Sequence, residues 1–277
     1  MRIFDGKSKA QKILLILKER ISKNKITPAL SVISVGKNLA SELFIRNKKQ
    51  AAENIGIKVN HLRFKETVSE EKIIKEIERL NNDVLINGII VQLPLPRKLN
   101  ARKIVGKVSP RKDIDGFLKE TYFSSPLILA ILTALEDSIR SFKNKKIMAL
   151  VNSDFLGQTL KKILKKEKIK ISYLLRKELS ESKIKRADII ITVCGCPNLI
   201  KGEMIKKGVI LIDGGITVLK DKKVVGDIDK KSVAEKASFL TPVPGGLGPL
   251  TVAYLLKNVY LAKQREVLAK AEDEGKL

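Results

Sequence analysis

The sequence contains few of the side chains that bind transition metals or form disulfide frameworks. Its 277 residues include two cysteines, Cys194 and Cys196, a single histidine, His61, and no tryptophan. A structural zinc site takes four cysteine or histidine ligands, and the chain has only three such side chains. No metal is therefore expected, and a Ser-His-Asp or Cys-His mechanism is disfavoured because either would have to use His61. We interpret His61 as structural and both cysteines as small buried residues near a strand end.

Long hydrophobic runs are also absent. No stretch of 18 apolar residues exists, so no membrane span is expected. The apolar stretch at residues 13–17 is too short for a secretory signal, and it continues into a helical pattern. One face of that helix carries the apolar residues Ala10, Ile13, Leu14, Leu17 and Ile21. This pattern predicts an amphipathic helix at the start of a cytoplasmic protein.

Acidic residues are outnumbered, with 55 lysines and arginines against 30 aspartates and glutamates, a formal net charge of +25. Such a balance favours anionic partners, among them nucleic acids and phosphate-bearing small molecules. The lysines are scattered through every segment, however, and aromatic residues make up only 4% of the chain. Because single-stranded nucleic acids are bound on stacked aromatic rings, nucleic-acid binding is not expected as the main role.

The first 100 residues alternate between strand and helix patterns. Short apolar strands are predicted at residues 29–36, 58–64 and 84–96, and helices at residues 41–57 and 69–82. The glycine at position 56 and the serine at position 69 suit a helix end and a helix start. Strand, helix, strand, helix, strand is typical of a parallel α/β sheet.

A second run of the same kind follows a helix predicted over residues 126–141. Its strands are predicted at residues 146–152, 170–175, 188–195 and 209–216, and its helices at residues 156–168 and 202–207. The chain is thus expected to form two α/β lobes with a ligand cleft between them. Residues 1–125, completed by a helix from residues 248–277, would form one domain, and residues 126–247 the other.

Four stretches contain side chains suited to chemistry. Phe44 and Lys48 are four residues apart, so a helix places the ring and the amine on one face. Gln92 follows an apolar strand, at the position where α/β proteins bind ligands. Asp113 and Asp115 flank a turn in "KDIDGF", which can also be an Asx-type turn. "TPVPGGLGPLT", residues 241–251, is a shaped loop before a helix, because so many prolines and glycines exclude a strand or helix interior.

The order and spacing of these stretches resemble the bifunctional methylenetetrahydrofolate dehydrogenase/methenyltetrahydrofolate cyclohydrolase (FolD) family, of which this chain is identified as a divergent member. The resemblance covers nearly the whole length. It is carried by "ASELFIRNKKQAAENIGI", "NGIIVQLPLP", "SPRKDIDGF", "LIDGGI", "VVGDID" and "TPVPGGLGPLTVAYLLKN". It implies a homodimeric enzyme with a folate-binding lobe and a Rossmann-like lobe. Such an enzyme oxidises 5,10-methylenetetrahydrofolate with NADP, or with NAD, and hydrolyses the methenyl product to 10-formyltetrahydrofolate.

The resemblance also implies roles for individual residues. Lys48 would be the catalytic lysine, Gln92 its hydrogen-bonding partner and Asp115 the carboxylate that binds the pterin. The implied substrate-binding residues are Phe44, Pro94, Pro244, Gly245 and Gly246. The implied cofactor-binding residues are Asn152, Ser153, Gly157, Arg176, Gly195 and Thr251. A lysine can activate water only if burial or a nearby cation lowers its pKa toward neutrality.

Departures from the family pattern leave two alternatives open. Phe44 replaces the family tyrosine, so it can stack on a pterin but offers no hydroxyl to Lys48. In "VNSDFLGQT", Val151, Asn152 and Thr159 replace a glycine, an arginine and a proline of the family's nucleotide loop. Arg176 or Lys177 could supply the missing positive charge. One alternative is therefore a cyclohydrolase with weak or lost dehydrogenase activity, and the other is a non-catalytic folate or nucleic-acid binder.

Overall fold

The computed structural model describes residues 1–273 and divides the chain into two compact units, each built on a parallel sheet. The six-stranded unit comprises Met1–Lys9 and Leu127–Thr251, and the three-stranded unit comprises Ala10–Pro126 and the chain from Val252 onward. The last four residues of the predicted C-terminal helical segment, 274–277, lie outside the described residues. The two-lobed α/β class is confirmed. Within residues 1–273, no helix has both the length and the apolar character needed to cross a bilayer.

The three-stranded unit has the strand order β3-β2-β4, and all pairs are parallel. Its strands are β2 (Ala29–Val35), β3 (Lys58–Phe64) and β4 (Gly88–Val91). The predicted strand over residues 84–96 was too long. Its first residues form a turn in which the Leu85 N–H donates to the Asp83 carboxylate. Its end contains prolines, which have no N–H to donate to a sheet.

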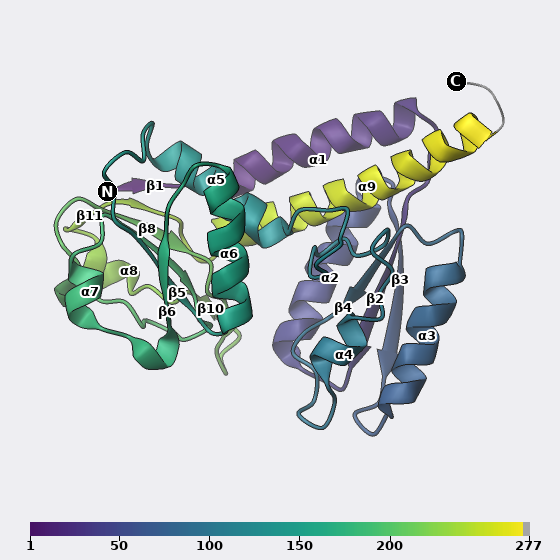
Figure 1. The fold of residues 1–277 in the computed structure, drawn as a ribbon, viewed down its shortest axis with the longest axis horizontal. Coiled ribbons are helices and arrows are strands. Elements are labelled where there is room, and N and C mark those ends of the chain that lie inside the picture. The colour runs from purple at the N-terminus through teal and green to yellow at the C-terminus, as the bar shows by residue number, and fades with distance from the viewer. Residues whose placement is uncertain (274–277) are drawn as a thin grey trace. The chain divides into compact units, whose positions relative to one another are not determined.

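Helices flank these strands (Figure 1). Side-chain caps mark where several of them begin. They are α2 (Leu39–Glu53), α3 (Glu70–Asn82), α4 (Ala101–Val105) and parts of α1 (Gly6–Lys23) and α9 (Leu247–Asp273). Ser69 caps α3 as predicted, accepting from the Lys72 N–H at 3.3 Å. The predicted apolar face of α1 is confirmed, since Ala10, Leu17 and Ile21 are buried.

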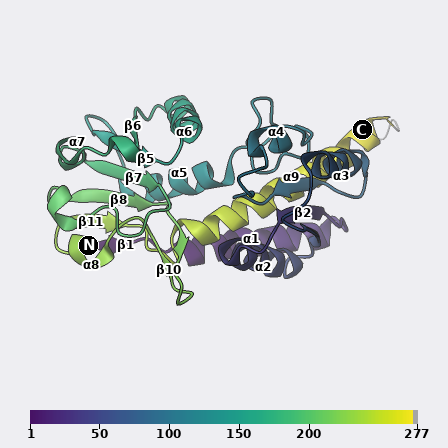
Figure 2. The ribbon, with the colours of Figure 1, turned by 90° about the horizontal axis from the view of Figure 1, so that it is seen from below.

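The six-stranded unit has the order β1-β11-β8-β7-β5-β6, again with parallel pairs throughout (Figures 1 and 2). The predicted strands correspond to β5 (Ile147–Val151), β6 (Ser172–Leu175), β7 (Ile189–Val193) and β8 (Val209–Asp213). The connecting helices include α5 (Pro126–Ser138), α6 (Asp154–Lys166), α7 (Glu181–Lys185) and α8 (Lys230–Val233). A separate antiparallel hairpin joins β9 (Thr217–Val218) to β10 (Val224–Val225).

Two strands of this sheet were not predicted, β1 (Arg2–Ile3) and β11 (Ala237–Leu240). Both are too short for a periodic pattern. Their pairing, Arg2 with Phe239 and Ile3 with Leu240, groups the first nine residues with the six-stranded unit. The proposed domain division at residues 125 and 247 stays a prediction.

Two predicted helices are shorter than expected. α5 ends at Ser138, three residues before the predicted end. The helix predicted over residues 202–207 is a single 3₁₀ turn, η2 (Gly202–Met204). Gly202 packs there against the backbone carbonyl of Ser232, and the chain turns into β8 at Gly208, whose φ is +82°. A longer helix has no room between these points.

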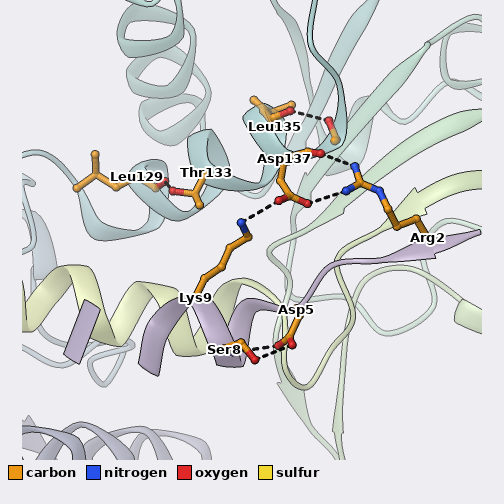
Figure 3. A network of polar contacts seen from close by, with 9 residues as sticks. Arg2, Asp5, Ser8, Lys9, Leu129, Thr133, Leu135 and Asp137 are labelled. Atoms are coloured by element: carbon orange, nitrogen blue, oxygen red, sulfur yellow. Dashed lines mark hydrogen bonds and ion pairs between the residues drawn. The ribbon is translucent and has the colours of Figure 1, made fainter. Parts of the chain in front are cut away.

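A polar network attaches β1 and the start of α1 to the end of α5 (Figure 3). The Asp137 carboxylate pairs with the Arg2 guanidinium at 3.1 Å and with the Lys9 amine at 2.8 Å. Asp5 accepts from the Ser8 N–H at 3.0 Å and from the Ser8 hydroxyl at 2.7 Å, which satisfies a donor at the start of α1. The two ion pairs of Asp137 are partly exposed, so each contributes about 1 kcal/mol or less to stability.

The glycines near the start of α1 and in the loop at residues 241–246, before α9, are required by backbone packing within the six-stranded unit. A Cβ atom at Gly6 would overlap the carbonyl oxygen of Gly246. A Cβ atom at Gly246 would lie 2.5 Å from the Pro242 carbonyl oxygen, which accepts the Gly246 N–H at 2.7 Å. The loop therefore needs glycine for its own shape, whatever it binds.

We expect Gly6→Ala to destabilise the protein by about 1–3 kcal/mol, because backbone atoms must move to admit the methyl group. Thermal unfolding measures this as a melting temperature lowered by several degrees. The matched control is Gly248→Ala in the first turn of α9, where the nearest atom to an added Cβ is 3.7 Å away. Equal melting temperatures for the two variants would contradict the packing argument.

Candidate functional site

Three polar side chains from separate segments converge in the three-stranded unit. Lys48 lies on α2, and its amine donates to the Gln92 side-chain oxygen at 3.1 Å. Gln92 directly follows β4, where its backbone N–H continues the ladder by donating to Ile33 at 2.8 Å. Asp115 lies in the loop after Ile114, close enough for its charge to act on Lys48. The structure thus brings together the amine, the amide and the carboxylate that sequence reasoning selected.

The surroundings of this cluster disfavour charge. Burial lowers the pKa of Lys48, and the Asp115 carboxylate offsets part of that effect. Burial also raises the pKa of Asp115, with Lys48 acting in the opposite direction and Asp113 adding to the rise. Desolvation is the largest cause for both groups, because removing water penalises whichever form is charged. Lys48 therefore holds its proton less tightly than a solvated lysine does, as a general base requires.

The two neighbouring aspartates have different environments. The buried Asp113 carboxylate accepts from the N–H groups of Phe117 at 3.3 Å and Leu118 at 2.8 Å, so it holds its own loop, but through residues four and five positions on and not through the i+2 contact of an Asx turn. Gly116 completes the turn with φ +68°. Asp115, half-buried, makes no hydrogen bond to the described part of the chain. Its two oxygens remain available to a ligand.

The remaining predicted residues of this unit lie nearby in sequence. Phe44 is half-buried one turn before Lys48 on α2, and Pro94 is exposed two residues after Gln92. Asn258 of α9 holds the backbone next to Asp115, because its side-chain amide donates to the carbonyl oxygens of Ile114 at 2.8 Å and Ser124 at 3.0 Å. The contacts of Phe44 and Pro94 with folate stay predictions. Sequence reasoning missed Asn258, which lies in a helix pattern without any distinguishing motif.

We expect Asp115→Asn to lower the pKa of Lys48 further, since the substitution removes the anion that favours the protonated amine. Removing about 1 kcal/mol of attraction corresponds to about a fivefold larger neutral fraction at a fixed pH below that pKa. Reductive methylation, followed by mass spectrometry across pH, would measure the labelling of Lys48. Lys112 serves as the internal reference. Its pKa is shifted by burial, Asp83 and Glu266 and not by Asp115, so its labelling should not change in the variant. An unchanged labelling profile at Lys48 would contradict the coupling.

The six-stranded unit gathers predicted cofactor residues at the carboxyl edge of its sheet. Asn152 follows β5, Arg176 follows β6 and Gly195 follows β7, three strands that are adjacent in the sheet. All three residues are exposed, and Gly195 has φ +62° with open space around it. Ser153 caps α6 by accepting from the Leu156 N–H at 3.4 Å. This edge, with a helix N-terminus beside it, is where open α/β sheets bind nucleotides.

Two predicted cofactor residues lie elsewhere in the unit. Gly157 is buried in α6, and a Cβ atom there would lie 2.5 Å from the Tyr173 ring on β6. Close helix–strand packing explains this glycine. Thr251 lies in α9, where its hydroxyl donates to the Leu247 carbonyl oxygen at 3.0 Å. A direct contact of either residue with a cofactor stays a prediction.

An acidic residue occupies the first turn of α6. The Asp154 carboxylate accepts from the Tyr173 hydroxyl and from the Gln158 amide, both at 2.6 Å. A carboxylate at a helix N-terminus is stabilised by the same N–H groups and dipole that bind phosphate. Asp154 therefore places a negative charge at this helix N-terminus, with its oxygens bound to Tyr173 and Gln158.

The loop that contains Pro244, Gly245 and Gly246 belongs to the six-stranded unit. Pro244 is exposed, and Gly245 has φ +107° with the Lys7 side chain 3.7 Å from where a Cβ would be. The predicted role of these residues in shaping a folate site stays a prediction. In the part of the chain that the structure describes, no three His, Cys, Asp or Glu side chains are grouped to hold a metal ion.

Sequence reasoning missed a pair of buried aspartates at the same sheet edge. Asp213 ends β8 and Asp227 follows β10, and both side chains are almost completely buried. Burial and the neighbouring Asp227 raise the pKa of Asp213 to about 7. The signal was present in "LIDGGI" and "VVGDID", where each aspartate adjoins a glycine, but it was used only as a mark of resemblance.

Comparison with known proteins gives concordant matches. The tetrahydrofolate dehydrogenase/cyclohydrolase catalytic domain matches residues 4–115, and the NAD(P)-binding domain of the same family matches residues 126–267. The chain is 36% identical over 276 residues to the bifunctional protein FolD of Staphylococcus aureus, covering 95% of this chain and 96% of the relative.

Solved structures agree over the same extent. The bifunctional FolD enzyme of Campylobacter jejuni aligns with a TM-score of 0.87 at 34% identity, covering 96% of this chain and 99% of the other. The Trypanosoma brucei dehydrogenase-cyclohydrolase, solved with NADP and an inhibitor, aligns with a TM-score of 0.88 at 29% identity, covering 96% and 98%.

Proposed function

The chain belongs to the tetrahydrofolate dehydrogenase/cyclohydrolase family, and on that premise we propose how its residues divide the family's two reactions. It is an enzyme of one-carbon folate metabolism that oxidises 5,10-methylenetetrahydrofolate and hydrolyses 5,10-methenyltetrahydrofolate. The proposal assigns hydrolysis to the cluster of Lys48, Gln92 and Asp115. It assigns cofactor binding to the carboxyl edge of the six-stranded sheet.

Hydrolysis requires water to add to the cationic methenyl carbon. In the proposed mechanism the neutral Lys48 amine accepts a proton as the water oxygen bonds to that carbon. The ammonium then returns a proton to the ring nitrogen whose bond to the carbon breaks, which leaves a formyl group on the other nitrogen. One proton is released overall. Gln92 orients the amine through the 3.1 Å hydrogen bond without adding charge, and this contact to a desolvated lysine is the observation that carries the proposal.

The Asp115 carboxylate is proposed to bind the pterin. It lies half-buried beside Lys48 and makes no hydrogen bond to the described residues, so its oxygens can accept from the amino group and ring N–H of the heterocycle. A pterin N–H would supply the hydrogen bonds that the protein leaves unmade. Phe44, one turn from Lys48 on α2, is proposed to stack on the same ring.

We expect Lys48→Met to abolish hydrolysis of methenyltetrahydrofolate while folate affinity stays within about tenfold, because methionine keeps the volume but cannot transfer protons. The loss of methenyl absorbance measures hydrolysis, and methylene oxidation is assayed separately with NADP and NAD. The control is Lys49→Met, an exposed lysine on the same helix that pairs with Glu53 at 3.8 Å. Unchanged hydrolysis in Lys48→Met would remove this lysine from the mechanism.

NADP is the proposed cofactor, held at the sheet edge formed by β5, β6 and β7. When bound, it supplies the hydride acceptor for methylene oxidation. The arginine of the family's nucleotide loop is replaced here by Asn152, and Arg176 is the exposed cation that follows the next strand. Its guanidinium acts on both Cys194 and Asp227, so it lies near the β7 turn. We propose that Arg176 binds the 2′-phosphate of the adenosine ribose.

Arg176→Ala is therefore expected to raise the KM for NADP about tenfold or more, since a hydrogen bond to a charged group contributes about 1.5–3 kcal/mol. The KM for NAD, which lacks the phosphate, should stay within about twofold. Arg186→Ala is the matched control, because this exposed arginine precedes β7 at the opposite edge of the sheet. A parallel rise for both nucleotides would show that Arg176 does not select the phosphate.

One observation favours the second candidate, a cyclohydrolase with weak dehydrogenase activity. Asp154 places negative charge at the N-terminus of α6, where a dinucleotide phosphate would bind. The cluster around Lys48 shows no comparable departure among its polar groups. A high ratio of hydrolysis to oxidation in the paired assays would support this candidate, and brisk oxidation with absent hydrolysis would exclude it.

The assembly and location of the enzyme are also proposals. The family resemblance supports a homodimer that acts in the cytoplasm on tetrahydrofolate substrates.

A further inference from the structure

We propose that Asp227 is a positioning residue for the dinucleotide: its carboxylate holds the Cys194–Gly195–Cys196 turn at the end of β7 in the conformation that receives the cofactor. The inference rests on the proposed dehydrogenase function. It explains two sequence segments, "LIDGGI" and "VVGDID", for which the mechanism has no use.

The contact itself is a two-oxygen clamp on the turn. One carboxylate oxygen of Asp227 accepts from the Cys194 N–H at 2.6 Å, and the other accepts from the Cys196 N–H at 2.7 Å. These two N–H groups flank Gly195, which has φ +62° and nothing within 4 Å of a would-be Cβ. Binding both neighbours fixes the left-handed backbone of Gly195 and keeps its exposed side open.

A second aspartate holds the first one in place. Asp213, at the end of β8, accepts from the N–H groups of Asp227 at 3.1 Å and Ile228 at 3.0 Å. It also accepts from the Gly215 N–H at 3.0 Å and the Thr192 hydroxyl at 3.2 Å. Asp213, fixed at the end of β8, thus positions the backbone of Asp227, and the Asp227 side chain in turn positions the β7 turn. The Cys196 contact is part-buried and the other links are buried, so water does not readily replace them when one is lost.

Two glycines make this arrangement possible. A Cβ atom at Gly215 would overlap the Asp227 carboxylate, and a Cβ atom at Gly226 would overlap an oxygen of Asp213. Asp227 therefore lies directly against Gly215, two residues after Asp213, and Asp213 lies directly against Gly226, which adjoins Asp227. The paired Asp and Gly residues of the two segments are needed together, because neither carboxylate fits beside a larger residue.

An asparagine cannot replace Asp227 in this clamp. Its amide offers one acceptor oxygen and turns an NH₂ group toward the second backbone N–H, so one side of the turn loses its partner. The turn is then expected to sample conformations that do not accept the dinucleotide. The cluster around Lys48 belongs to the other compact unit, so hydrolysis gives an independent measure of correctly folded protein.

The decisive experiment compares Asp227→Asn with Asp229→Asn in the full-length protein. Asp229 is two residues away and also accepts from two backbone N–H groups, but those groups, at 3.1 and 3.4 Å, begin α8. We expect Asp227→Asn to raise the KM and the dissociation constant for NADP at least tenfold, with methenyl hydrolysis within twofold of the wild type. Asp229→Asn should leave the affinity for NADP within twofold.

The two cysteines provide a readout that needs no catalysis. They are the only thiols in the chain, and both lie in the clamped turn, with Cys194 buried. In Asp227→Asn we expect 5,5′-dithiobis(2-nitrobenzoate) to react at least fivefold faster than in the wild type, and in Asp229→Asn at the wild-type rate. Loss of stability and of both activities together, with wild-type NADP affinity and thiol reactivity per folded molecule, would overturn the positioning role.

Failure of the proposed function gives a different result. A wild-type protein that hydrolyses methenyltetrahydrofolate but oxidises nothing contradicts the dehydrogenase assignment, and calorimetric titration with NADP still decides the role of Asp227. A wild-type protein that does not bind NADP overturns both.

Discussion

The removal of charged groups from water is the constraint on which the sites of both units depend. An ionised group removed from water is costly unless hydrogen bonds or an opposite charge compensate it. In the three-stranded unit, Lys48 and Asp115 compensate each other only partly, so the pKa of the amine is lowered and the carboxylate is free to bind. In the six-stranded unit, backbone N–H groups offset part of the desolvation of Asp213 and Asp227 and occupy their carboxylate oxygens, although burial still raises the pKa of both groups.

These two arrangements suit different roles: the Lys48–Asp115 pair can act on a ligand, and the Asp213–Asp227 pair holds the backbone in place. A carboxylate that accepts several backbone N–H groups fixes the loops that donate them, and it has little capacity left for a ligand. Asp113 and Asp115 show the same division within three residues, since the first holds its own turn and the second makes no hydrogen bond to the described residues. Chemistry is expected where a desolvated group still has hydrogen-bonding capacity that the protein does not use.

Sequence reasoning predicted the elements whose patterns are long enough to be periodic. β2, β3, β5, β7 and β8 were expected where they occur, because their apolar runs have strand length and end in glycine or polar residues. β1 and β11 were missed, since two to four residues form a strand only when a partner strand supplies the other half of the hydrogen bonds. The 3₁₀ turn at Gly202 was predicted as a longer helix. Local composition favours a helix there, but it cannot show that the Ser232 backbone packs directly against Gly202.

The sequence by itself determined the two-lobed α/β class, the family, and the residue types available for chemistry, because those follow from local patterns and specific short segments. Only the tertiary structure decided that Lys48 meets Gln92, that Asp113 and Asp115 differ, and that Asp227 binds the turn around Gly195. Each of these depends on distances between residues far apart in the chain and on how much water reaches them. Local sequence contains neither quantity, since packing of the whole unit sets both.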